Sequence, residues 1–145
     1  MELPLNNAVF KADIQPDRRD ARQPPERAIG RVIACDGARA TILSAVSAGG
    51  WQANDAWALG RMMSINLGAG RIVALVYKLR SVEMVWNEGE NPIQVDVEFL
   101  GEVLEPADGK ARFRRGITNY PPIGAIAHRI RAGDLALVHD LGDRA

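Results

Sequence analysis

The sequence contains a single cysteine and no excess of charge of either sign. Because Cys35 is the only cysteine, no disulfide can form within the chain, as is usual in a reducing compartment. Lysine and arginine together number 18, and so do aspartate and glutamate, so no net charge attracts the chain to DNA or to anionic lipid. The longest apolar run, residues 72–77, is far shorter than the roughly 20 residues of a membrane-spanning helix, and residues 1–15 do not have the pattern of a secretory signal. We therefore expect a soluble cytoplasmic protein without a membrane partner.

The residue patterns of common enzyme and metal sites are also missing. The glycine-containing turns 68–71 and 108–111 have no lysine followed by serine or threonine, which a phosphate-binding loop requires. His128 and His139 are the only histidines, they are not spaced as paired ligands on one helical face, and no second cysteine could complete a zinc site. Cys35 lies in an apolar run, where we expect a small core residue rather than a nucleophile. We therefore expect no catalytic, cofactor-binding or metal-binding residue in this chain.

The residues that are present divide the chain into three parts. Residues 1–27 are charged, contain prolines and have few large apolar side chains, which predicts a disordered leader. In residues 28–131, short β-prone runs alternate with turn sequences, and no helical pattern lies between them. About six such strands, all between residues 28 and 115, predict a mainly β fold in which they close on themselves as a small six-stranded β-barrel, because closure removes exposed sheet edges. Residues 132–145 predict a short C-terminal helix whose first turn Asp134 could cap.

Two segments have the strand pattern most clearly. Residues 93–99 alternate strictly between apolar and polar side chains, which predicts a half-buried strand. Its polar residues Asp96 and Glu98 are expected to be solvated or bonded to a neighbouring arginine. Residues 72–77 are apolar on both faces, which is typical of a strand in the middle of a sheet.

The three tryptophans occupy different contexts. Trp51 and Trp57 lie in an irregular, glycine-led linker, where they could fold back as a lid on the barrel or mark an interface. Trp86 follows a strand run, and we expect it at the rim of the core.

A cationic run follows the alternating strand. It contains one aromatic residue, Phe113, and four basic residues: Lys110, Arg112, Arg114 and Arg115. Alternate spacing would place Lys110, Arg112 and Arg114 on one face of a strand. Three interpretations remain open: a solvated face whose charges pair with Glu102 and Glu105, a contact with acidic residues of a neighbouring subunit, or a contact with the phosphates of nucleic acid.

The segment FRRGITNYPPIGA, residues 113–125, overlaps this run and has a geometry of its own. Its two successive prolines lack backbone donors and hold the preceding tyrosine in an extended conformation. We expect a rigid structural brace formed by Gly116, Tyr120, Pro121, Pro122 and Gly124.

Five segments, in order, resemble the amino-terminal domain of HerA-type ATPases. They are IGRVIACDGARATI (29–42), LGRMMSI (59–65), VEFLGEVLE (97–105), FRRGITNYPPIGA (113–125) and DLALVHDL (134–141). The resemblance covers about residues 28–142, and FRRGI together with YPPIG is its most specific part. HerA-type ATPases are hexameric DNA translocases and helicases. Their leading domain, the HAS barrel, is similar to the barrel that begins the large subunits of rotary ATP synthases.

The resemblance implies a non-catalytic role in assembly for these residues. In the family, a RecA-like motor with the phosphate-binding loop follows the barrel and binds ATP and Mg²⁺, so residues 132–145 would form the exit toward that motor. The resemblance also implies a homo-hexamer that acts on DNA as a full-length ring and, in members that process DNA ends, a nuclease partner. The alternative is a stand-alone nucleic-acid-binding barrel of the oligonucleotide-binding type. It would use the strand 110–115, and only Phe113 and Tyr77 could stack on bases.

Overall fold

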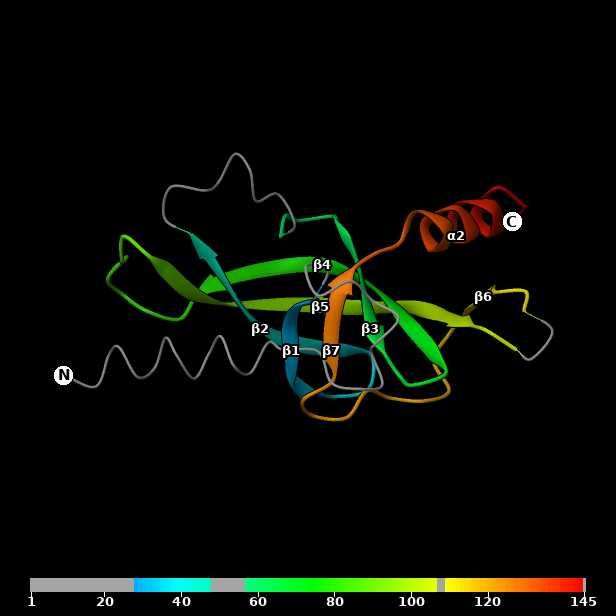
Figure 1. The fold of residues 1–145 in the computed structure, drawn as a ribbon, viewed down its shortest axis with the longest axis horizontal. Coiled ribbons are helices and arrows are strands. Elements are labelled where there is room, and N and C mark those ends of the chain that lie inside the picture. Colours follow the sequence, from blue (N-terminus) through cyan, green and yellow to red (C-terminus); the bar gives the residue numbers. More distant parts are fainter. Residues whose placement is uncertain (1–27, 48–56, 107–108, 145) are drawn as a thin grey trace.

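The computed structural model describes residues 28–47, 57–106 and 109–144, which form seven strands and one helix (Figure 1). The elements are β1 (Ala28–Cys35), β2 (Arg39–Ser47), β3 (Met62–Asn66), β4 (Gly70–Ser81), β5 (Glu90–Leu104), β6 (Arg112–Arg115), β7 (Ile126–Arg129) and α2 (Ala132–Arg144). The expected leader, residues 1–27, lies outside the described residues.

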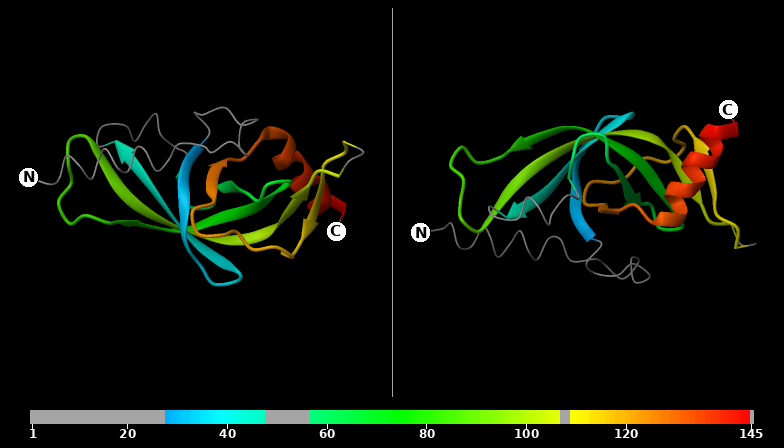
Figure 2. Two further views of the ribbon diagram at one scale, coloured as in Figure 1. Left: turned by 60° about the horizontal axis from the view of Figure 1, so that its bottom comes forward. Right: turned by 90° about the horizontal axis from the view of Figure 1, so that it is seen from above.

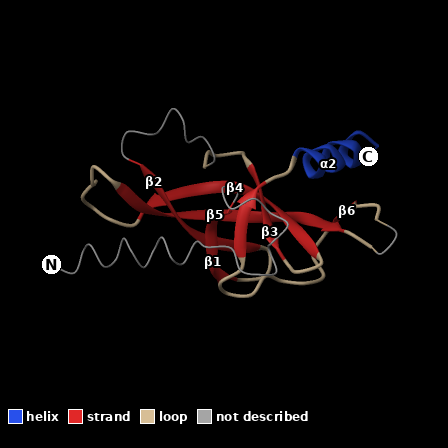
Figure 3. Cartoon of the chain, in the orientation of Figure 1, coloured by secondary structure: helices blue, strands red, loops and turns tan. Residues whose placement is uncertain are grey.

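Six of the strands close into an antiparallel barrel, which confirms the predicted fold class (Figure 3). The hydrogen-bonded order is β2-β1-β7-β3-β4-β5, and β5 returns to β2 from the pair Arg39–Glu98 to the pair Ser47–Glu90. Aliphatic side chains from the strands of this ring fill its interior, among them the fully buried residues Val32, Ile42, Ile65, Ile72 and Val95. The barrel therefore encloses a packed core.

The strand that completes the ring is not the one that the sequence indicates. We expected the strands between residues 28 and 115 to close on themselves. Instead β7 completes the barrel, because it pairs with β1 on one side and with β3 on the other. Strand β6 lies outside the ring and pairs with β5. The sequence of β7 is Ile-Ala-His-Arg, which is too short and too irregular to produce a strand pattern.

The two clearest strand predictions are confirmed. In β5, Ile93, Val95 and Val97 are buried in the core while Glu98 is exposed. Asp96 is also buried, but it is bonded to an arginine as expected: its carboxylate accepts hydrogen bonds from Arg80 Nη2 at 2.9 and 3.0 Å. Strand β4, which contains the predicted run 72–77, is central, because it pairs with both β3 and β5.

Strand β5 has 15 residues and extends beyond the barrel at both ends (Figures 1 and 2). Two strands pair with the same edge of β5: β2 pairs with residues 90–98, and β6 pairs with residues 101–104. Gly101 lies at the change of partner, where a Cβ atom would be 2.3 Å from the carbonyl oxygen of Arg114. At the opposite end, residues 82–89 connect β4 to β5, and we call this connection together with its flanking strand residues, 81–91 in all, the hairpin tip. The hairpin tip and β6 therefore project from opposite ends of the barrel.

A second glycine permits the close crossing of β1 over β2. A Cβ atom on Gly30 would lie 2.6 Å from Cγ2 of Ile42 and 2.7 Å from the carbonyl oxygen of Leu43. Ile42 is fully buried, and the backbone of Leu43 is held in the β1–β2 pairing. Only a residue without a side chain fits at this crossing.

The tryptophan predictions have mixed outcomes. Trp57 is buried, packs in the core and donates a hydrogen bond from Nε1 to Ser44 Oγ at 2.8 Å, so the lid interpretation is confirmed for this residue. Trp51 lies outside the described residues. The prediction for Trp86 is wrong, because this side chain is 50% exposed in the hairpin tip. Strand β4 ends at Ser81, so the chain has already left the barrel at Trp86.

The C-terminal helix is present, but its first turn is stabilised differently from the prediction. Asp134 does lie in that turn, yet its carboxylate binds the guanidinium of Arg71 on β4 instead of acting as a cap. The amide of Leu135 donates to the carbonyl oxygen of Arg131 at 3.0 Å, which begins the helical hydrogen bonding. Within the described part of the chain, no helix has the length and apolar character needed to cross a membrane.

Candidate docking site

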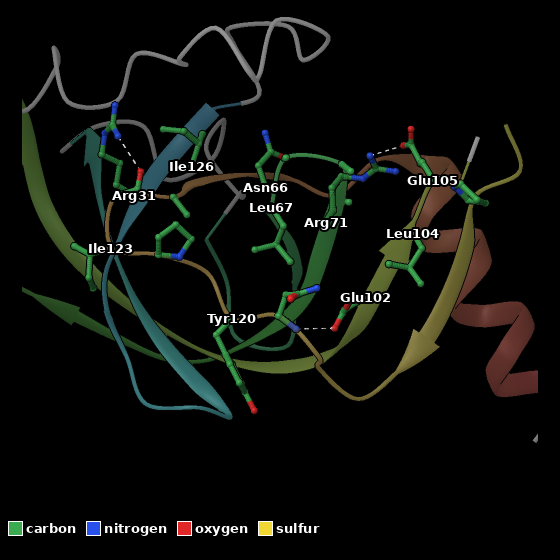
Figure 4. A pocket seen from close by; sticks show the side chains of 18 of the residues that line it. Arg31, Asn66, Leu67, Arg71, Glu102, Leu104, Glu105, Tyr120, Ile123 and Ile126 are labelled. Carbon is green, nitrogen blue, oxygen red and sulfur yellow. Dashed lines mark hydrogen bonds and ion pairs between the residues drawn. The ribbon is translucent and has the colours of Figure 1, made fainter. Parts of the chain in front are cut away.

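A surface groove of about 840 Å³ lies at the β6 end of the barrel (Figure 4). It opens between the β3–β4 turn, the end of β5 and residues 116–125, which we call the brace loop. Both charged and apolar side chains line the groove, including Arg31, Leu67, Leu104, Arg112, Tyr120 and Ile123. The lining thus combines apolar side chains with several charged ones, so a partner bound there would meet both kinds of group.

One end of the brace loop is hydrogen-bonded to β1. The amide of Gly124 donates to the carbonyl oxygen of Val32 at 2.7 Å, and the amide of Val32 donates to the carbonyl oxygen of Ala125 at 2.9 Å. Arg31 Nη1 donates to the carbonyl oxygen of Gly124 at 2.9 Å. Gly124 has a φ of 94°, a conformation that favours glycine, so the sequence position of this residue suits its geometry.

The other end of the brace loop is held by a buried carboxylate. The side chain of Glu102 is 1% exposed, and it accepts hydrogen bonds from the amide of Thr118, from Thr118 Oγ1 at 2.9 Å and from the amide of Asn119 at 3.3 Å. Burial alone would raise the pKa of Glu102. The hydrogen bonds from Thr118 and Asn119 and the nearby charge of Arg114 outweigh burial and lower the pKa of Glu102 below its ordinary value.

We expect the Glu102→Gln variant to have a free energy of unfolding about 1.5 kcal/mol lower at neutral pH, because the amide donors of Thr118 and Asn119 lose charged acceptors. This difference should shrink in acid. The pKa of Glu102 is lower in the folded chain than in the unfolded chain, so its stabilising contribution is complete above the unfolded value of about 4.3 and is lost as the pH falls through the folded pKa. Urea unfolding of both proteins over a pH series measures the difference.

The Glu98→Gln variant is the matched control for this experiment. Glu98 lies on the same strand but is exposed. Its substitution should change the free energy of unfolding by less than about 0.5 kcal/mol at every pH. A loss of stability in Glu102→Gln that stays constant down to acid pH would contradict the assigned role of the carboxylate.

A buried ionic cluster closes the groove beside α2. Arg71, at the start of β4, is 5% exposed and forms a bidentate pair with Asp134 of α2, with Nε at 2.7 Å and Nη2 at 3.0 Å. Nη1 of Arg71 lies 2.5 Å from Oε1 of Glu105, and Nη1 of Arg131 lies 3.9 Å from the same oxygen. Burial alone would lower the pKa of Arg71, but the two carboxylates outweigh burial and raise it. The cluster ties α2 to the ends of two barrel strands.

The predicted brace residues differ in burial and in backbone contacts. Pro121 is buried and Gly124 is bonded to β1, as a brace requires. Gly116 has a φ of 88° and turns the chain out of β6. Tyr120 and Pro122 are exposed, however, and the side chain of Tyr120 points away from the other labelled residues of the groove (Figure 4). The outer face of the loop therefore presents apolar side chains to solvent, with Tyr120 57% and Ile123 67% exposed.

The four basic residues do not form one row. Lys110 precedes β6. Within this strand, Arg112 and Arg114 share one face and Arg115 lies on the other. Arg112 lines the groove. Arg114 lies opposite Glu102 in the β5–β6 register, with Nη2 at 3.6 Å from Glu102 Oε1 and 3.0 Å from Thr118 Oγ1. Local pairing with Glu102 is thus present for Arg114, while Arg115 is exposed and forms no ion pair with the described residues.

The hairpin tip is a candidate contact surface that sequence reasoning missed. Met84 is fully exposed, Val85 and Trp86 are largely exposed, and every residue from 81 to 90 is on the surface. The tip is nevertheless ordered by Asn91, whose buried side chain accepts from the amide of Asn87 at 2.6 Å and donates to its carbonyl oxygen at 2.9 Å. The sequence signal was available: an apolar cluster beside a glycine- and asparagine-containing break, outside any strand.

The cysteine and the two histidines lie on three different elements. Cys35 is partly buried and packs against the core, as expected. His128 is buried in β7, whereas His139 is exposed on α2 and lines a smaller groove of about 390 Å³. Within residues 28–47, 57–106 and 109–144, no three histidine, cysteine or acidic side chains converge as a potential metal site.

Comparison with known proteins adds no family assignment. Neither a protein-family model nor a curated protein sequence matches the chain.

Proposed function

We propose that this chain is the non-catalytic amino-terminal barrel of a HerA-like hexameric DNA translocase, in which it serves ring assembly and partner docking. The observation that carries the proposal is a barrel with a filled interior and ordered elements projecting from both ends. In a domain built in this way, the side chains that can bind a partner lie on the outer surface, as a docking role requires. ATP and Mg²⁺ would bind to the motor of the full-length protein, and DNA and a nuclease would be partners of the complete ring.

The attachment of α2 supports the same role. The chain leaves the barrel through β7 and enters a helix whose first turn is tied to β4 and β5 by the pairs of Arg71 with Asp134 and Glu105. A helix held at two strand ends fixes the direction in which the chain continues. A domain that orders a motor within a ring needs such a fixed exit.

The alternative of a stand-alone nucleic-acid-binding barrel has less support. Both aromatic residues that could stack on bases have contacts within the chain, although Tyr77 is still 40% exposed. The guanidinium of Arg39 lies over the ring of Tyr77, 5.1 Å from its centroid. The ring of Phe113 packs against Gly101, close enough that a Cβ atom there would lie 2.6 Å from Phe113 Cζ. A single-strand-binding barrel needs such rings to be open to the nucleic acid.

Sedimentation velocity and DNA-binding measurements on the same protein test the proposal. We expect weak, concentration-dependent self-association, because motor domains normally contribute most of the buried area of such rings. We expect no binding of a fluorescent single-stranded oligonucleotide at physiological salt and no ATP turnover. Tight DNA binding by the monomer would contradict the proposal. If that binding weakens steeply with salt and is lost in Arg114→Ala/Arg115→Ala, the alternative function is correct.

The sequence encoded in frame after Ala145 is an independent test. The proposal expects a RecA-like domain whose phosphate-binding loop ends in lysine followed by serine or threonine. A different domain at that position would contradict the assignment to a HerA-like translocase and leave the architecture of the barrel unaffected.

A further inference from the structure

We propose that the hairpin tip of one copy of this chain docks into the groove and against the basic residues of β6 on a second copy. The inference rests on the proposed role in assembly and names the two surfaces that would carry it. The tip is defined above as residues 81–91, and we call residues 110–115, beside the groove, the basic end.

The two surfaces are complementary in charge. Residues 81–91 contain three acidic residues, Glu83, Glu88 and Glu90, and no basic residue. Residues 109–120 contain the four basic residues of the basic end and no acidic residue, and of these four Arg114 is paired with Glu102 on β5. The chain as a whole has 18 basic and 18 acidic residues and hence no net charge. The two segments nevertheless carry opposite charges. A second copy of the chain is therefore an occupant that matches each surface.

The two surfaces are also complementary in apolar character. The tip exposes Met84, Val85 and Trp86 on a loop that Asn91 keeps ordered. On the other surface, Ile123 is exposed beside the apolar residues of the groove, and Tyr120 is exposed on the outer face of the brace loop. Exposed tryptophan, methionine and tyrosine are enriched at protein interfaces, and a charged rim around an apolar centre is the usual arrangement. An ordered loop also loses little conformational entropy on binding.

The contact must join different copies, because a single chain cannot bring its two surfaces together. Strand β5 runs continuously from the hairpin tip to the residues that pair with β6. Its 15 residues span about 45 Å along the strand at roughly 3.3 Å per residue. Figures 1 and 2 place the tip and β6 at opposite ends of the molecule in each view. An interface between two different patches, arranged head to tail, is heterologous. It repeats from copy to copy, and it closes into a ring when the rotation between neighbouring copies is a whole fraction of a full turn.

Photo-cross-linking tests the contact directly. p-Benzoylphenylalanine replaces Met84, whose side chain is fully exposed, so the substitution removes no packing. On irradiation we expect a cross-linked dimer whose attachment sites, mapped by mass spectrometry, lie in the groove or the basic end. The control carries the same probe in place of Ala136, an exposed residue of α2. Dimers attached elsewhere, or no dimer from the Met84 position, would overturn the inference.

Charge reversal supplies a second test with an internal check on folding. The tip variant is Glu83→Lys/Glu88→Lys, and the basic-end variant is Lys110→Glu/Arg112→Glu. Each variant alone should self-associate at least about tenfold more weakly than the original chain, because like charges then face each other. In an equimolar mixture both contacts pair opposite charges again, so association should be restored. Rescue on mixing also demonstrates that both variants are folded.

The outcomes separate this inference from the proposed function. If the original chain self-associates, but both variants do so equally well, the named surfaces are wrong and the assembly role stands. If the monomer binds DNA tightly instead, the proposed function fails by its own test. Failure of the mixture to restore association, with both variants retaining the circular dichroism of the original chain, would overturn the inference.

Discussion

The Asp134→Asn variant is expected to lose about 3 kcal/mol of its free energy of unfolding, because the substitution leaves Arg71 buried with one of its two carboxylates removed. Arg71 is 5% exposed, so water cannot take the place of the missing charge. The loss should be concentrated where α2 meets the barrel. Urea unfolding measures the total effect, and hydrogen exchange should show faster exchange of the α2 amides at low denaturant.

Two further variants make this result interpretable. Asp140→Asn removes an exposed acidic residue of the same helix, and it should change the free energy of unfolding by less than about 0.5 kcal/mol. Arg71→Met/Asp134→Leu replaces the buried pair with apolar side chains and should recover a large part of the stability lost in Asp134→Asn. If Asp134→Asn is as stable as Asp140→Asn, the ionic cluster does not hold α2 in place.

The Gly30→Ala variant is expected to lose about 3 kcal/mol of its free energy of unfolding, at the upper end of typical overpacking effects. The added methyl group would lie 2.6 Å from Cγ2 of Ile42 and 2.7 Å from the carbonyl oxygen of Leu43. Neither atom can move freely, since Ile42 is fully buried and the backbone of Leu43 belongs to the β1–β2 pairing. Thermal and urea unfolding measure the loss.

Gly89→Ala is the matched control for overpacking. No atom lies within 4 Å of the position that its Cβ would occupy, and its φ is outside the range that favours glycine. Alanine there should leave the free energy of unfolding unchanged or raise it by about 0.5 kcal/mol, because it restricts the unfolded chain. Equal stabilities of Gly30→Ala and Gly89→Ala would mean that β1 and β2 can separate at the crossing without cost.

The strands with a strong hydrophobic pattern could be predicted from sequence, and the one without it could not. Alternation in 93–99 and the apolar run 72–77 identified β5 and β4, because side-chain periodicity reports burial directly. β7 has four residues and includes a buried histidine, so its membership of the barrel depends on the pairing with β1 and β3. Pairing between segments distant in sequence leaves no local trace in a single sequence.

The candidate site was only partly predictable for the same reason. The rigidity of residues 120–124 follows from two prolines and a glycine, which act locally. The partners of Glu102 and Arg71 lie 16 and 63 residues away in the chain, and their contacts arise only when β5, the brace loop and α2 are brought together. Trp86 was misplaced because a hydrophobic residue after a strand run was taken to remain near the core, whereas the hairpin carries it outward.

The pairing of β1 with β7 has a consequence for how this unit can be combined with others. Ala28 lies opposite His128 in that pairing, so the first and last strands of the ring are immediate neighbours. The start of β1 and the end of β7 therefore lie side by side. A barrel with adjacent entrance and exit can be inserted into a loop of a host protein as a cassette, or circularly permuted, without forcing its strands apart.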